Sequence, residues 1–196
     1  MDRSGIVEEA ARLICEESLT DYRGAKLKAL ERLGLPPRTA LPDNASIEAA
    51  VIDYLRLFGG EAYRTRLKRM RQLAPRLMRR LKDFEPRLTG GAVSGALTAA
   101  HRLQLHAFAD QAESLDVFLV ELNIAYDEGE RRYRYPDGRE LPIPLTRFEL
   151  DGIGVDVAVF PYDELDRRPP LSPNDGQPYR RLDLAEAERL AEAAID

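Results

Sequence analysis

The sequence predicts an α+β protein in which helices come first and strands follow. Within the first 85 residues, apolar side chains recur at helical spacings of three and four, as at Ile6, Ala10 and Leu13. Residues 153–160 are instead rich in valine and alternate in character with the period of two that is typical of a strand. Helices that precede strands, rather than alternating with them, indicate the α+β class.

Each expected helix has a sequence reason for its position. Five helices are expected, over residues 4–33, 46–58, 61–84, 111–123 and 183–194. Gly34 ends the first, and three prolines make the segment from Leu35 to Asn44 a loop. Pro75 lies inside the third helix and is expected to kink it or split it in two. Asp183 is expected to cap the last helix, which is acidic.

The strands are expected mainly in the second half of the chain. They are predicted over residues 103–108, 131–135, 141–150 and 153–160. Pro136, Asp137 and Gly138 form the expected turn of a hairpin whose first strand begins near residues 124–126. Pro142 and Pro144 favour an edge position for the strand that follows this turn. Residues 163–179 hold four prolines and a glycine, so we expect an irregular segment that wraps over the fold.

Length and composition limit the class of protein. With 196 residues, the chain can form a helical module and a compact α+β domain, and we expect a boundary between residues 1–85 and 86–196. The content of 44% hydrophobic and 32% charged residues is typical of a soluble globular protein. No stretch reaches the roughly 18 uninterrupted apolar residues of a membrane helix, and the N-terminal segment is too acidic for a signal peptide. We therefore expect a cytoplasmic protein with no membrane partner.

Positive charge is concentrated in the third expected helix. Residues 61–84 contain nine lysines and arginines but only two acidic residues, although the whole chain has a net charge of -5. Such a helix can follow the phosphates of RNA, or it can contact an acidic protein surface. The candidates for these contacts are Arg64, Arg69, Arg76 and Arg80. Alternatively, the arginines pair with acidic residues of the same fold. No aromatic residues alternate with the arginines to stack on bases.

A cluster of glycines, RLTGGAVSG, precedes the first expected strand. Gly90, Gly91 and Gly95 allow positive φ and a close approach of a ligand, and Ser94 adds a hydroxyl group. Backbone amides in such a turn can bind phosphate where a helix follows, and residues 96–100 are long enough to form a short one. These four residues are the candidates for binding phosphate or a nucleotide. The alternative is a tight turn that only packs against the sheet.

This cluster and the strands after it resemble the nucleotidyltransferase superfamily, the fold of polymerase-β-like and minimal nucleotidyltransferases. Leu88, Gly90 and Gly91 match the family's opening motif, and Ser94 and Gly95 extend it. Asp156, in VDVAVF, occupies the position of the family's third carboxylate. The resemblance covers about residues 87–161, and the chain is also similar to uncharacterised bacterial proteins with a basic helical region ahead of this domain.

The resemblance implies a site in which the metal ligands are lost. Active members use two carboxylates, two residues apart on a strand, to hold two magnesium ions on a nucleoside triphosphate. The matching positions here are Arg102 and Gln104, or Gln104 and His106, so this pair of carboxylates is missing. We therefore expect a non-catalytic, nucleotidyltransferase-like protein without a cofactor that binds a nucleotide, RNA or a protein partner.

Two alternatives remain open at this point. The chain could be an active nucleotidyltransferase that uses Asp110 and Asp156 as rearranged magnesium ligands, or a pure interaction module. In the second case its basic helix would bind an acidic surface, such as the C-terminal helix of another copy in a homo-oligomer. His101 and His106 have an odd spacing that places them on opposite faces of a strand, which disfavours a shared metal. A triad of Ser94, His106 and Asp156 lacks the sequence pattern of a nucleophile elbow.

Overall fold

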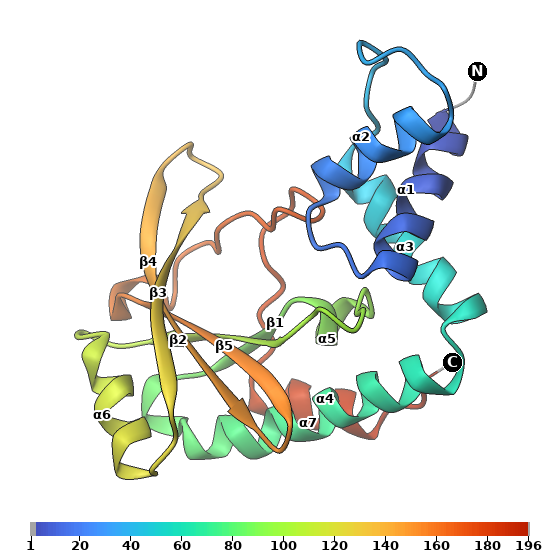
Figure 1. The fold of residues 1–196 in the computed structure, drawn as a ribbon. Helices are drawn as coiled ribbons and strands as arrows, with labels where there is room; N and C mark the ends of the chain where they lie inside the picture. Colours follow the sequence, from blue (N-terminus) through green and yellow to red (C-terminus); the bar gives the residue numbers. More distant parts are fainter. Residues whose placement is uncertain (1–2, 196) are drawn as a thin grey trace.

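The computed structural model describes residues 3–195 and confirms the α+β class, with helices ahead of a mixed sheet. The helices are α1 (Arg3–Glu17), α2 (Tyr22–Arg32), α3 (Asn44–Phe58), α4 (Gly60–Arg80), α5 (Gly91–Ser94), α6 (Glu113–Glu121) and α7 (Leu184–Glu192), with short 3-10 turns at Lys82–Phe84 and Tyr162–Glu164. Helices α1, α2 and α3 pack together at one end of the molecule, whereas α4 and α7 lie side by side against the sheet (Figure 1).

Five strands form one sheet in the order β1-β2-β5-β4-β3. They are β1 (Arg87–Thr89), β2 (Leu103–Phe108), β3 (Tyr126–Arg134), β4 (Glu140–Leu150) and β5 (Ile153–Phe160). The two central strands β2 and β5 run parallel, and all other neighbours are antiparallel. The strands predicted over residues 103–108 and 153–160 are confirmed to the residue.

The two faces of the sheet pack differently. Val155, Val157 and Val159 point into the main core, together with the buried stripe of α4 that includes Leu67 and Leu77. This core contains residues from both sides of residue 85, where the sequence predicts a domain boundary. The opposite face carries a smaller aromatic cluster of Phe108, Tyr133, Tyr135, Phe160 and Tyr179. Alternation of side chains along each strand produces these two faces.

The single helix predicted over residues 4–33 is wrong, because the chain forms two helices there. Ser18 adopts a positive φ of 53°, which a continuing α-helix does not allow. The Asp21 side chain then accepts a hydrogen bond from the backbone N–H of Arg23 and caps α2. The break therefore results from local hydrogen bonding in a segment whose apolar spacing alone predicts one helix.

Two of the expected effects of the prolines are corrected. Helix α4 is not split by Pro75, which is buried within it between other buried residues of the helix. The other expectation for Pro75, a kink, stays a prediction. Strand β4 is not an edge strand, because it pairs with both β3 and β5. Its pairing with β5 begins only at Leu145, however, so Pro142 and Pro144 lie where β4 has a neighbour on one side. Neither proline therefore has to donate a hydrogen bond to β5.

The final segment crosses the aromatic face of the sheet before α7. Its Leu182 forms a bridge with Leu88, next to the glycine cluster, and Leu171 bridges Pro178 to form a small loop. Helix α7 begins as predicted, because Asp183 and Glu186 form a reciprocal capping box. Within residues 3–195, no helix combines the length and the apolar character needed to cross a membrane.

Candidate ligand-binding site

A row of polar residues crosses the sheet on the face opposite to the main core. Thr89 of β1 lies opposite Gln104 of β2, Gln104 lies opposite Asp156 of β5, and Asp156 lies opposite Arg147 of β4. Residues that pair directly across strands project from the same face of a sheet. All four border one cavity of about 570 Å³, a volume in the range of small-molecule sites.

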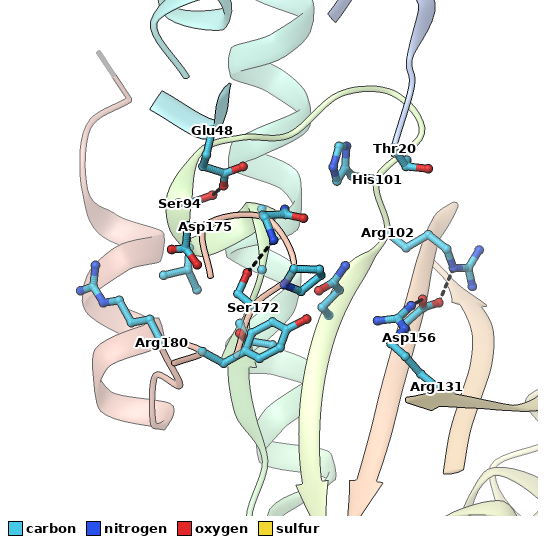
Figure 2. A pocket seen from close by; sticks show the side chains of 18 of the residues that line it. Thr20, Glu48, Ser94, His101, Arg102, Arg131, Asp156, Ser172, Asp175 and Arg180 are labelled. Carbon is cyan, nitrogen blue, oxygen red and sulfur yellow. Dashed lines mark hydrogen bonds and ion pairs between the residues drawn. The ribbon is translucent and has the colours of Figure 1, made fainter. Parts of the chain in front are cut away.

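Four separate parts of the chain enclose this cavity (Figure 2). The sheet forms one wall, and the glycine turn after β1 forms another. Glu48 reaches it from α3 and Thr20 from the loop between α1 and α2, and several residues of 172–180 border it from the final segment. Glu48 lies beside Ser94 on one side, while Asp156 lies between Arg102 and Arg131 on the other.

Arginines occupy both oxygens of the Asp156 carboxylate. Arg102 Nε lies 2.5 Å from Oδ1, and Arg131 Nη2 lies 3.2 Å from Oδ2. Arg102 also donates to the carbonyls of Phe148 and Val155, which fixes its guanidinium group in place. Asp156 is buried, so these contacts supply the compensation that a buried charge requires. A metal ion would have to displace at least one guanidinium group to reach this carboxylate.

Other polar groups that border the cavity have no partner in the described part of the chain. Arg147 and Arg180 are exposed, and their side chains make no hydrogen bond or ion pair with any residue of 3–195. The Gln104 amide is also without a partner there. Thr89 is 1% exposed, and its hydroxyl oxygen is buried with no hydrogen-bond partner. Buried polar groups in proteins are nearly always paired, so this wall has hydrogen-bonding capacity that the fold does not use.

The backbone geometry of the turn after β1 requires glycine at its first position, Gly90. Gly90 has φ 74° and ψ −152°, and a Cβ there would lie 2.5 Å from the Gln104 Oε1 atom. Of the four residues predicted to bind phosphate, Gly90, Gly91 and Ser94 border the cavity, whereas Gly95 does not, and its carbonyl accepts a hydrogen bond from the Tyr63 hydroxyl. The helix expected over residues 96–100 is not formed. Instead, the single turn α5 follows Gly90 directly and ends at Gly95, where φ is 91°.

A half-buried carboxyl group, that of Glu48, links the N-terminal helices to this turn. Ser94 Oγ donates to Glu48 Oε1 at 3.1 Å, and the Tyr22 hydroxyl donates to the other oxygen of Glu48. Burial raises the pKa of Glu48, and the nearby charge of Asp175 raises it further. The contact therefore places a carboxyl group with a raised pKa against the glycine turn.

The two histidines have different surroundings. His101 borders the cavity, and its Nδ1 accepts a hydrogen bond of 3.0 Å from the backbone N–H of Thr98, so the neutral ring carries its proton on Nε2. His106 is buried in the aromatic cluster, where its Nδ1 accepts from Arg181 Nε at 3.0 Å. Burial, together with Arg181 and Arg131, lowers the pKa of His106 well below its usual value. His106 therefore does not face Ser94 and Asp156 across the cavity, whereas Arg102 and Gln104 both border it.

Asp110 and Asp156 are not brought together. Asp110 lies in the loop after β2 and borders a different cavity, next to Asp83 and Tyr162. Gln104, which pairs with Asp156, is six residues from Asp110, or roughly 20 Å along an extended chain. The structure therefore gives no support to a site that uses both carboxylates.

The candidate arginines of α4 fall into two groups. Arg69 donates to the carbonyl of Asp151 at 3.0 Å, and Arg76 pairs with the carboxylate of the same residue at 3.1 Å. These two arginines hold the turn between β4 and β5, as the pairing alternative predicts. Arg64 and Arg80 are exposed and have no partner within residues 3–195.

Sequence reasoning missed several residues of the site, namely Glu48, Arg131, Arg147, Arg180 and the loop at 172–177. Across residues 3–195, no three His, Cys, Asp or Glu side chains form a group that could hold a metal ion. Comparison of the chain with protein-family models, curated proteins and solved structures finds no match. A function must therefore be inferred from the chemistry of the cavity itself.

Proposed function

We propose that the chain binds a phosphate-bearing ligand, a nucleotide, in this cavity and does so without a metal ion. The observation that supports this proposal is the state of Asp156. Both of its oxygens are paired with arginines, while Arg147 and Arg180 border the same cavity without an acidic partner. Guanidinium groups are well suited to phosphate because they combine charge with fixed hydrogen-bond geometry.

The neutral groups of the cavity fit the nucleoside part of such a ligand. Thr89 and Gln104 offer a hydroxyl and an amide without partners, and Asn174 offers a second amide from the loop at 172–177. Tyr179 adds an aromatic ring to the same wall. An anionic part and a polar, partly aromatic part can therefore be bound together. The resemblance of residues 87–161 to nucleotidyltransferases supports the same ligand class.

The site favours binding over nucleotidyl transfer. Transfer with two metal ions needs carboxylates that are free to coordinate them. Asp156 is committed to Arg102 and Arg131, and Asp110 borders another cavity. No observation therefore favours the rearranged catalytic site.

The interaction-module alternative also gains no support from α4. Helix α7 of the same chain already packs against α4, with Arg79 paired to Glu188 at 2.6 Å. The acidic C-terminal helix of a second copy would have to compete with this contact.

Thermal unfolding in the presence of nucleotides tests the proposal. A ligand that binds only the folded state raises the melting temperature in a concentration-dependent way. We expect nucleoside mono-, di- or triphosphates to do so equally in magnesium and in EDTA. Arg147→Gln should weaken the effect about tenfold in affinity, the order expected for one charge-assisted contact.

Arg80→Gln is the matched control, because Arg80 is an exposed arginine whose side chain has no partner in residues 3–195 and does not border this cavity. A shift that requires magnesium, or a shift that Arg147→Gln leaves unchanged, would contradict the proposal.

A further inference from the structure

A second cavity shares one lining residue, His101, with the first. It has a volume of about 300 Å³ and is formed between α4, the loop before β2 and the turn between β4 and β5. Arg66 and Arg69 border it from α4, while Gly152 and Gly154 form part of its floor. His101 borders both cavities and therefore lies between them.

The second cavity is cationic. The Arg66 side chain makes no hydrogen bond or ion pair with any described residue, and the Arg69 side chain makes one hydrogen bond, to the backbone carbonyl of Asp151. The backbone N–H of Thr98 fixes the proton of the neutral His101 ring on Nε2, which has no partner within residues 3–195. None of the described residues that line the cavity is acidic. Its free polar side chains are therefore predominantly hydrogen-bond donors.

The two cavities differ in the part of a ligand that they can bind. The first combines arginines with the Tyr179 ring and neutral amides, which suits a whole nucleotide. The second is smaller and offers two arginines and an imidazole beside glycine backbone, with no aromatic ring other than His101. This chemistry suits a phosphate group and gives a base nothing broad to stack on.

We infer that the second cavity is a phosphate subsite for a nucleic-acid strand whose terminal nucleotide occupies the first cavity. The inference rests on the proposed function, because it requires a nucleotide in the first cavity. Consecutive nucleotides are joined by single phosphates, so a strand places its next phosphate beside the bound terminal nucleotide. The ligand class is then an oligonucleotide end, and α4 contributes through Arg66 and Arg69 at this one point rather than through its whole basic face.

Competition binding distinguishes this subsite from binding in the first cavity. A fluorescent mononucleotide bound to the full chain is displaced by unlabelled mono-, di- and tetranucleotides of RNA and of DNA, and by inorganic polyphosphate. We expect the affinity to rise about tenfold from mononucleotide to dinucleotide, as for one added charge-assisted phosphate contact. The dependence of log affinity on log salt should steepen by about 0.7 over the same step.

In Arg66→Gln, the rise in affinity from mononucleotide to dinucleotide and the accompanying change in salt dependence should disappear, while the affinity for the mononucleotide is retained. Arg66 has no partner in the described chain, so the melting temperature should not change. Arg80→Gln, on the same helix but outside both cavities, should keep the step. The comparison of RNA with DNA then shows whether a 2′-hydroxyl contributes.

Three outcomes would overturn the inference. These are an equal affinity for mono- and dinucleotides, a step that persists in Arg66→Gln, and an affinity for polyphosphate that equals the affinity for the oligonucleotides. In each case mononucleotide binding would still stand, and the proposed function with it. A wild-type chain that binds no mononucleotide would instead remove the proposed function.

Discussion

At the scale of single residues, the chemistry of the site depends on which groups neutralise one another. Asp156 lies where the resemblance places a metal-binding carboxylate, yet Arg102 and Arg131 hold both of its oxygens. The resemblance places either Arg102 and Gln104 or Gln104 and His106 where the family has its carboxylate pair, but the sequence does not show that Arg102 turns onto Asp156. That contact depends on Gly154, where a Cβ would lie in steric conflict with the Arg102 guanidinium group.

Glu48 provides a prediction on the pH dependence of stability. Its pKa is raised in the folded state by burial, so the folded chain binds more protons than the unfolded chain above the usual pKa of 4.5. The contribution of Glu48 to the stability of the wild type should therefore fall as the pH rises through its folded pKa. Glu48→Gln removes this penalty and keeps an oxygen that can accept from Ser94 or Tyr22.

The melting temperatures of the wild type and Glu48→Gln, compared from pH 4 to pH 8, test this prediction. We expect the melting temperature of the variant to rise relative to that of the wild type as the pH rises. A difference that is constant with pH would show that Glu48 ionises as freely in the folded chain as in the unfolded one, and a difference in the opposite direction would show that it ionises more readily there.

At the scale of elements, the most demanding position is the turn between β1 and α5. Gly90→Ala places a side chain at φ 74° and ψ −152°, and its Cβ would meet Gln104. We expect a loss of about 1–3 kcal/mol from the backbone conformation alone, with a further loss from the contact. Adding Gln104→Ala to this variant should recover only the stability that is lost through the contact between the new Cβ and Gln104. Urea unfolding of the two single variants and the double variant measures this, and a full recovery would mean that the backbone there is not strained.

The capping box of α7 gives a second prediction at this scale. The Asp183 side chain accepts from the backbone N–H of Glu186 at 2.8 Å, and the Glu186 side chain accepts from that of Asp183 at 2.9 Å. Asp183→Ala should lower the free energy of unfolding by about 1 kcal/mol. Glu192→Ala, an exposed change in the last turn, should stay within about 0.5 kcal/mol. Equal effects in both variants would assign no stabilisation to the cap.

Elements were predictable where a local signal decided them. The strand at 153–160 follows from its valines, and the start of α7 follows from Asp183. The break between α1 and α2 was not predictable from apolar spacing, because it depends on Ser18 and on the cap that Asp21 forms. The position of β4 between β5 and β3 was missed because its prolines indicate an edge strand. The prolines are tolerated there because β4 pairs with β5 only from Leu145 onward, beyond both of them.

At the scale of the whole molecule, the cavity exists because distant segments meet over one face of the sheet. Glu48 comes from α3, Arg147 from β4 and Arg180 from the final segment, and no local pattern links them. One of the three could have been found. The turn at Asp151 and Gly152 is apparent in the sequence, and counting outward from it pairs Arg147 with Asp156. Glu48 and Arg180 depend on packing between elements and required the structure.

The measurement that tests the central claim most directly is the nucleotide affinity of Asp156→Asn, determined by calorimetry in magnesium and in EDTA. This change frees Arg102 and Arg131 from their acidic partner, so we expect nucleotide binding about tenfold tighter than in the wild type, equal in both buffers. Stability should fall by about 1–3 kcal/mol through the lost ion pairs. Binding that is abolished in a folded Asp156→Asn chain, or binding that requires magnesium in the wild type, would contradict a metal-independent anion site and restore Asp156 as a metal ligand.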